Sequence, residues 1–151
     1  MIPISSASEY AIRALTYLAS RRGEGGFWLV RRIAEEIGVP GPFLVKILQP
    51  LVQCGILESQ RGRGGGYRLA RSAGDVTLLE IVDAQERLQR TRKCLLGQAE
   101  CSDERACPLH EYWKWTHEGF ISRLRRTTLK DLTRFCQARP QSGYPGGRRS
   151  A

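Results

Sequence analysis

The chain has 151 residues, with 24 Lys and Arg against 15 Asp and Glu, which gives a formal charge of +9 at pH 7. Its 41% hydrophobic content allows a folded core, but no apolar run is long enough to span a membrane, and Glu9 and Arg13 interrupt the N-terminus where a signal peptide is apolar. Composition therefore excludes a membrane protein and a disulfide-dense secreted scaffold, and predicts a basic cytoplasmic protein with an anionic partner.

The positive charge is concentrated in two segments. Residues 27–71 hold seven basic and three acidic side chains, and residues 138–151 hold three basic and no acidic ones. The second segment is rich in Pro, Gly and Ser and lacks apolar periodicity, so it is predicted to be a disordered tail. On composition alone a solvated surface explains the first segment, but there the charge coincides with dense helix and hairpin signals, which indicates nucleic-acid binding.

The first two helices are marked by a start signal and a stop signal. One helix is predicted to begin near Ser6, because Ser6 and Glu9 have the spacing of a capping box, and to end at a glycine-rich turn. Residues 27–29 are compatible with a short strand. A second, shorter helix follows and ends at Gly38.

A third helix is predicted from Pro42 to about Cys54, directly after a tight turn. Its polar side carries Lys46 and Gln49, and the opposite side carries a periodic apolar stripe. Pro50 lies inside this helix and is expected to kink its second half. The N-terminal half, which would meet DNA bases, is unaffected.

A β-hairpin follows, with strands over residues 56–59 and 67–69 and a glycine-rich turn that carries two arginines. A glycine run alone is more often a flexible turn, so it is the order helix, turn, helix and hairpin that predicts a winged helix. The DNA major groove admits one helix, and an arginine-bearing tip can track phosphates or enter the minor groove. The residues expected to contact DNA are Pro42, Phe43, Lys46, Gln49, Arg61 and Arg63.

Three further helices are predicted after the hairpin. Thr77 with Glu80 and Thr128 with Asp131 have capping-box spacing at the starts of two short helices. Between these two, residues 108–126 form a long helix with a stripe of aliphatic and aromatic side chains, which either a second copy or the same chain must cover. The expected class is mainly α, a winged helix-turn-helix with a long C-terminal dimerisation helix and a cysteine-rich loop. The expected domains are the DNA-binding domain over 1–75, the connecting helix, cysteine loop and dimerisation helix over 76–137, and the tail over 138–151.

Three of the five cysteines, Cys94, Cys101 and Cys107, fall within 14 residues, and His110 follows three positions after the last of them. The intervening gaps of six and five residues are wider than those that usually separate paired zinc ligands. They suit a larger group, an iron–sulfur cluster, which thiolates spread along a loop can reach. A zinc ion and unliganded thiols remain alternatives. The remaining two, Cys54 and Cys136, are expected to be ordinary small hydrophobic residues, Cys54 buried and Cys136 near the chain end.

Six segments together resemble one known family. They are SEYAIRAL in the first helix, PFLVKILQPLVQCGIL across the third, RGRGGGYRLAR at the hairpin, VTLLEIVDA in the fourth helix, the cysteine triplet with CPLH, and TTLKDL near the end. Over residues 1–137 the chain resembles the Rrf-type winged-helix transcriptional regulators, which include the iron–sulfur cluster biogenesis regulator and the nitric-oxide-sensitive repressor. The resemblance implies a homodimer with crossed long helices and a cluster that modulates DNA binding.

The resemblance also implies a ligand set for the cluster. Cys94, Cys101 and Cys107 match the three cysteine ligands. His110 matches the histidine ligand of the branch with a 2Fe-2S cluster, and Glu9 matches the acidic ligand that a partner subunit supplies to a 4Fe-4S cluster in the other branch. We favour 2Fe-2S with His110, because carboxylate is an uncommon cluster ligand. The first cysteine gap differs from both branches, so the cluster type stays open.

The sequence thus predicts a cytoplasmic, dimeric, DNA-binding transcriptional regulator, a repressor whose cluster senses redox state, nitric oxide or iron supply. A cluster-free regulator of the same fold that uses cysteine thiols or zinc is the alternative. An enzyme is not expected, because His110 and His117 are the only histidines and no set of nucleophile, base and oxyanion donors can be assembled.

Overall fold

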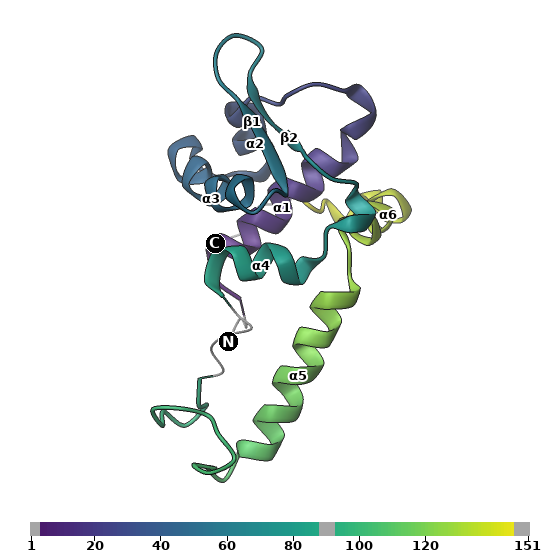
Figure 1. Cartoon of the computed structure of the whole chain (residues 1–151). Coiled ribbons are helices and arrows are strands. Elements are labelled where there is room, and N and C mark those ends of the chain that lie inside the picture. The colour runs from purple at the N-terminus through teal and green to yellow at the C-terminus, as the bar shows by residue number, and fades with distance from the viewer. Residues whose placement is uncertain (1–3, 88–92, 147–151) are drawn as a thin grey trace.

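In the computed structural model, which describes residues 4–87 and 93–146, six helices and one β-hairpin make up the regular structure. The helices are α1 (Ser6–Ser20), α2 (Val30–Ile37), α3 (Gly41–Gln53), α4 (Leu78–Glu86), α5 (His110–Arg126) and α6 (Leu129–Ala138), and the strands are β1 (Leu57–Gln60) and β2 (Gly66–Leu69). All elements except α5 pack into one body; α5 contacts this body through α4 at one end, and its other end extends away from it (Figure 1). The predicted mainly α class with a helix-turn-helix and a wing is confirmed.

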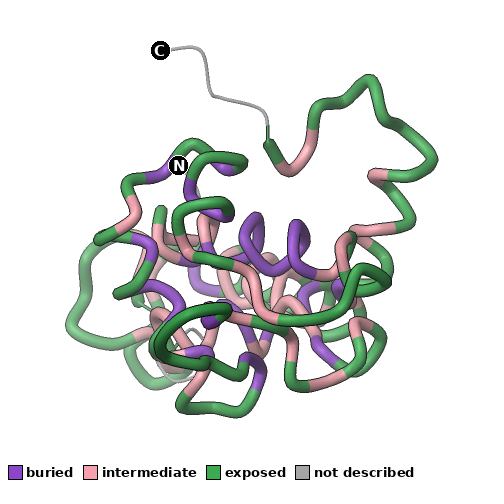
Figure 2. Tube along the Cα trace, turned by 90° about the horizontal axis from the view of Figure 1, so that it is seen from above, coloured by how far each residue is buried: buried purple, intermediate pink, exposed green. Residues whose placement is uncertain are grey.

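Helix α1 is the centre of this body. Eight consecutive residues, Ala11–Leu18, are buried, because α1 contacts α2, α3, α4 and α6 on its different sides. Leu15 of α1, Ile33 of α2 and Leu44 of α3 are fully buried side chains of one apolar core. Figure 2 shows the buried residues gathered in the interior of the trace. The periodic apolar stripes of the sequence therefore point toward α1, as helices around one core require.

The start of α1 differs from the prediction. The N-cap is Ser5, whose hydroxyl accepts a hydrogen bond from the Ser8 N–H at 3.1 Å, so the capping box assigned to Ser6 and Glu9 is wrong by one position. The carboxylate that completes the cap comes from the far end of α4. Glu86 accepts from the Ser5 N–H at 3.0 Å and from the Ser8 hydroxyl at 2.5 Å. Glu86, which is distant in sequence, thus supplies the capping carboxylate that the local spacing had assigned to Glu9.

Helices α2 and α3 form the predicted helix-turn-helix. Gly38 ends α2 in the left-handed conformation, at φ 71°, which glycine adopts without steric penalty. Pro42 stands in the first turn of α3, and the helix continues through Pro50. Cys54, expected to be buried, is exposed at the C-terminal end of α3, so that expectation is wrong. The end of a surface helix offers no core around this thiol.

The hairpin uses two of its glycines for close backbone approach. A side chain at Gly65 would collide with the Gln60 carbonyl, and one at Gly66, where φ is 137°, would collide with the Trp28 carbonyl. Trp28 and Tyr67 exchange two backbone hydrogen bonds of 2.8 Å, so the short strand expected at residues 27–29 exists as a single β-bridge. The glycine run is therefore a structural requirement of the wing rather than only a flexible turn.

Both later capping boxes are confirmed, Thr77 with Glu80 at α4 and Thr128 with Asp131 at α6. Burial raises the pKa of Glu80, but the Thr77 N–H and the Arg71 guanidinium outweigh it and hold this pKa below its ordinary value. The Thr128 N–H likewise lowers the pKa of Asp131. The two caps face each other, because Thr77 and Thr128 form a β-bridge that ties the start of α4 to the start of α6.

The segment expected to be a disordered tail, residues 138–151, is described as far as residue 146. It forms a 3₁₀ turn over Pro140–Ser142 and then lies against α1, where Arg13 donates to the Pro145 carbonyl at 2.7 Å. The neighbouring Tyr144 is half-buried, whereas Arg139 of the same segment is exposed. Residues 147–151 lie outside the described part of the chain.

Candidate DNA interface and cysteine site

The outer face of α3 carries four of the six residues predicted to contact DNA. Pro42, Lys46 and Gln49 are exposed there, while the apolar stripe of the helix faces α1. Phe43 is 42% exposed, and its ring packs edge-on against Tyr10 of α1 with centroids 6.1 Å apart. Phe43 therefore also anchors α3 to the core, which its position in the sequence did not reveal.

A groove separates α3 from the wing. Gln49 lines one wall, and Gln60, Arg61 and Tyr67 of the hairpin line the other. Arg63 is exposed in the turn beyond the groove. The helix and the arginine-bearing turn thus flank a common hollow, the arrangement by which a winged helix places one element in a DNA groove and another along the backbone.

Ion pairing decides which basic side chains of this segment are available to phosphates. Three arginines are already engaged by carboxylates, in the pairs Arg31–Glu35 at 3.0 Å, Arg68–Glu58 at 2.7 Å and Arg71–Glu80 at 2.8 Å. In the part of the chain that the structure describes, Lys46, Arg61 and Arg63 form no ion pair. The uncompensated charge of the segment therefore includes one side chain on α3 and two on the wing, where DNA would lie.

The cysteine loop, residues 93–109, stands at the end of α5 that points away from the winged body (Figure 1). Its beginning is fixed to α5, because the indole N–H of Trp113 donates to the Lys93 carbonyl at 2.8 Å. Its end leads into α5, which begins at His110 rather than at the predicted Pro108. The backbone N–H of His110 donates to the Cys107 carbonyl at 2.9 Å and so forms the last turn before the helix.

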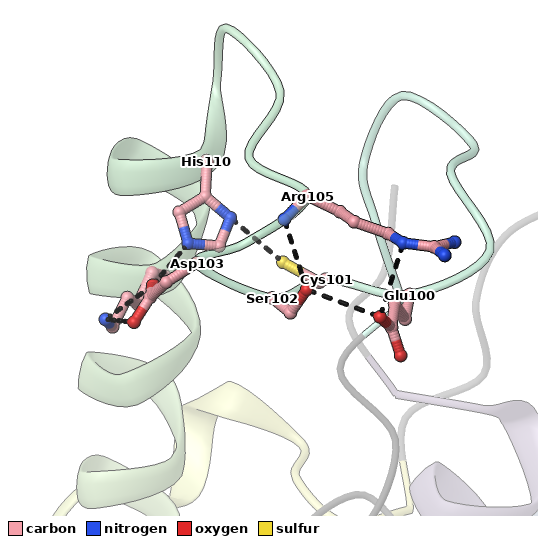
Figure 3. A network of polar contacts seen from close by, with 7 residues as sticks. Glu100, Cys101, Ser102, Asp103, Arg105 and His110 are labelled. Carbon is pink, nitrogen blue, oxygen red and sulfur yellow. Dashed lines mark hydrogen bonds and ion pairs between the residues drawn. The ribbon is translucent and has the colours of Figure 1, made fainter.

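The structure places the four predicted ligands in two separate pairs. In the first pair, the Cys101 Sγ lies 3.6 Å from the His110 Nδ1 (Figure 3). In the second, the thiol of Cys107 contacts that of Cys94. The Gln98 N–H, followed by further backbone N–H groups of the same turn, holds the pKa of the Cys94 thiol below its ordinary value. Such a turn favours the thiolate, the form of cysteine that binds metals.

The two pairs do not form one compact set around a single ion. Among the described residues, one group of three potential metal ligands has all its ligand atoms within 4.8 Å of one another. It consists of Asp103, His110 and Glu111 and contains no cysteine. Zinc ligands lie about 2.0–2.3 Å from the metal and therefore close together. Within the described part of the chain, the three thiols and the imidazole therefore do not form the compact set that one zinc ion requires.

Asp103 and Lys114 belong to this site, and sequence reasoning missed both. The His110 ring is 3% exposed, and its Nε2 lies 2.8 Å from the Asp103 carboxylate. Lys114 donates to the same carboxylate at 3.0 Å and 3.2 Å. The hydrogen bond from His110, and then that from Lys114, lowers the pKa of Asp103. The four-residue spacing of His110 and Lys114 on a helix could have indicated that Lys114 lies beside the site, but nothing in the sequence distinguishes Asp103 from other acidic residues of the loop. Glu9, the alternative fourth ligand, lies on a different element, in the first turn of α1.

Much of α5 is uncovered by its own chain. Tyr112 is 63% exposed and Trp115 is 75% exposed, whereas Leu124 near the other end is buried against the body. Helix α5 packs on α4. Among the described residues, no helix combines the length and apolarity that crossing a bilayer requires.

A helix-turn-helix followed by a wing, with basic side chains on both that form no ion pair with the rest of the described chain, defines a winged-helix DNA-binding protein. Residues 4–134 match the Rrf2 family, described as an iron-dependent transcriptional regulator. The chain belongs to this family, as its sequence motifs predicted. Because the family consists of transcriptional regulators, the expectation that the chain is not an enzyme is confirmed.

Individual relatives and structures agree with this assignment. The chain is 34% identical over 142 residues to Protein aau3 of Rhizobium meliloti, which covers 93% of this chain and 89% of the relative. It is 31% identical over 130 residues to a putative HTH-type transcriptional regulator of Aquifex aeolicus, which covers 85% and 89%. Among solved structures it resembles CymR, the global cysteine regulator of B. subtilis, with a TM-score of 0.74, 25% identity and coverage of 89% and 98%. It also resembles T. potens IscR, with a TM-score of 0.70, 25% identity and coverage of 88% and 87%.

Proposed function

We propose that this regulator is a cytoplasmic homodimeric repressor whose operator affinity depends on an iron–sulfur cluster held by Cys94, Cys101, Cys107 and His110. The observation that carries the proposal is the contact between the buried imidazole of His110, at the start of α5, and the sulfur of Cys101 in the preceding loop, which also carries Cys94 and Cys107. The resemblance to IscR points in the same direction.

The chemistry of the donor set fits such a cluster. Cys94 is stabilised as a thiolate by the N–H groups of its turn, and His110 presents Nδ1 to Cys101 while Nε2 is occupied by a carboxylate. Thiolates, with imidazole at selected positions, are the ligands that hold 2Fe-2S centres. When bound, the cluster supplies one-electron chemistry and iron atoms that oxidants and nitric oxide can attack. We favour 2Fe-2S, with 4Fe-4S and a partner-supplied Glu9 as the alternative.

The end of α4 offers a route from the loop to the DNA-binding elements. Gln85 donates from its side-chain amide to the Ile47 carbonyl of α3 at 2.8 Å, and Glu86 caps α1 through Ser5 and Ser8. The chain continues from Glu86, through residues outside the described part, to the cysteine loop. A change in the loop would therefore act on a turn that is bonded to both α1 and the DNA-facing helix α3.

The uncovered face of α5 supports the proposed dimer. Exposed aromatic side chains such as Tyr112 and Trp115 are costly on a free helix and are well suited to a second copy of α5. A dimer would present two copies of α3 and the wing to two operator half-sites, whose spacing is geometrically strict. Small movements of α5 would then change operator affinity strongly.

A thiol-based sensor is the second candidate, and one observation favours it. The Cys94 and Cys107 thiols are neighbours, and the pKa of Cys94 is lowered, which are the conditions for disulfide formation by an oxidant. In that case Cys101 and His110 would tune the reactivity of the loop.

Anaerobic purification distinguishes the two candidates. We expect a coloured protein that contains iron and acid-labile sulfide in the wild type and in the matched control Cys54→Ser, because Cys54 lies on the surface at the end of α3. Cys101→Ser should lose the colour. A colourless wild type that contains zinc or no metal contradicts the cluster, and operator binding that then responds to a disulfide between Cys94 and Cys107 would establish the thiol sensor.

A further inference from the structure

Each of the two ring nitrogens of His110 contacts another residue of the cysteine site. Nδ1 faces the Cys101 sulfur at 3.6 Å, and Nε2 faces the Asp103 carboxylate at 2.8 Å (Figure 3). The ring is 3% exposed, so water cannot replace either neighbour freely. The orientation of the imidazole is therefore determined by these two contacts.

The Asp103 contact decides which nitrogen carries the proton. Both oxygens of Asp103 already accept hydrogen bonds from Lys114, and a carboxylate accepts hydrogen bonds but does not donate them. Nε2 must then hold the proton, and in the neutral ring Nδ1 holds the free lone pair. That lone pair points to the side of the ring where the cysteine sulfur lies.

We propose that Asp103 is a positioning residue of the cluster site, which fixes His110 in the tautomer that offers Nδ1 as the ligand. This inference rests on the proposed cluster function. It follows the general pattern in which a metal-bound histidine donates its other ring N–H to a carboxylate. Glu111 lies near the same ring but is not hydrogen-bonded to it in the described contacts, so Asp103 alone has this role.

Lys114 supports Asp103 from the next turn of α5. Its ammonium reaches both carboxylate oxygens, at 3.0 Å and 3.2 Å, although the Asp103 side chain is 71% exposed. Because His110 and Lys114 are four residues apart on one helix face, α5 holds both groups that bind Asp103. The loop is thereby tied to α5 at the position of the proposed ligand.

The test compares Asp103→Ala with Glu104→Ala, which removes a neighbouring exposed carboxylate of the same loop that makes no contact with His110. Each anaerobically purified full-length protein is challenged with an iron chelator, and loss of the cluster is followed by absorbance. We expect the Asp103 variant to lose its cluster about 10- to 100-fold faster than wild type, and the Glu104 variant to behave as wild type. Equal rates for all three proteins would overturn the inference.

The ligating nitrogen gives an independent readout. Protein is produced with histidine labelled with ¹⁵N at either Nδ1 or Nε2, in a His117→Gln background so that His110 is the one labelled residue. The reduced cluster is then examined by pulsed electron paramagnetic resonance, where we expect the strong coupling from Nδ1. Coupling from Nε2 overturns the inference while the cluster function stands, whereas a wild type without any cluster overturns both.

Discussion

The link between α1 and α4 yields a stability prediction that can be worked from its contacts. Glu86 accepts from the Ser5 N–H at 3.0 Å and from the hydroxyl of Ser8, a fully buried residue, at 2.5 Å. Hydrogen bonds to a charged group contribute about 1.5–3 kcal/mol to stability. Glu86→Ala should lower the free energy of unfolding by about that amount. For a chain of this length, the melting temperature should fall by about 3–12 °C, at about 2–4 °C per kcal/mol.

Urea denaturation measures the change, and Glu35→Ala is the matched control. Glu35 also pairs with a neighbour, Arg31, but both side chains are well exposed, so its removal should change stability by less than about 0.5 kcal/mol. A double-mutant cycle of Glu86→Ala with Ser8→Ala should give a coupling energy of about 0.5 kcal/mol or more. If the two substitutions are additive, or if Glu86→Ala equals the control, Glu86 does not cap α1 and the reasoning fails.

Three further predictions concern the wing and the caps. Arg61→Ala should reduce the slope of log affinity against log salt by about 0.9, measured by fluorescence anisotropy on a duplex that the protein selects from random sequence; an unchanged slope removes Arg61 from the phosphate contacts. Gly66→Ala should cost more than about 1 kcal/mol and weaken DNA binding, because it places a Cβ against a carbonyl at positive φ, whereas Gly23→Ala, with open space around it, should be tolerated in the same urea titration. Folding lowers the pKa values of Glu80 and Asp131, so their ionised carboxylates stabilise the folded protein. This contribution is complete above the ordinary pKa values, 4.5 and 3.8, and is lost as the pH falls through the lower folded-state pKa values. Stability measured from pH 6 down should therefore fall less steeply in acid for a Glu80→Gln, Asp131→Asn variant than for wild type.

Periodicity and local caps predicted most of the fold, because these signals depend on residues that are close in sequence. Gly38 and the Thr77 and Thr128 caps were found this way. The cap of α1 was misplaced, since it is completed by Glu86, 81 positions after Ser5, and no local spacing encodes such a contact. The contact between Arg13 and the Pro145 carbonyl spans 132 positions and is likewise invisible to local patterns.

The cysteine site shows the same division between local and distant information. The spacing of three cysteines and His110 indicated a metal-binding loop, because thiols and imidazole are chemically distinctive. Asp103 could not be singled out, since one acid in an exposed, charged loop resembles any other until the loop is folded. Its importance lies in the 2.8 Å contact with a buried ring, which is a property of the fold.

The hydrogen bonds at the end of α4 contribute enough free energy to couple the cysteine loop to operator binding. Gln85 makes one neutral hydrogen bond to α3, which contributes about 0.5–1.5 kcal/mol, and Glu86 makes charged ones to α1, which contribute about 1.5–3 kcal/mol. Coupling between sites in allosteric proteins is typically about 1–3 kcal/mol. Weakening these bonds when the loop changes would therefore suffice to alter operator affinity, without any rearrangement of the core around Leu15. Since Ile47 lies on the buried side of α3 and Lys46 beside it faces outward, a displacement at the Gln85 contact would also move the surface that we propose binds DNA.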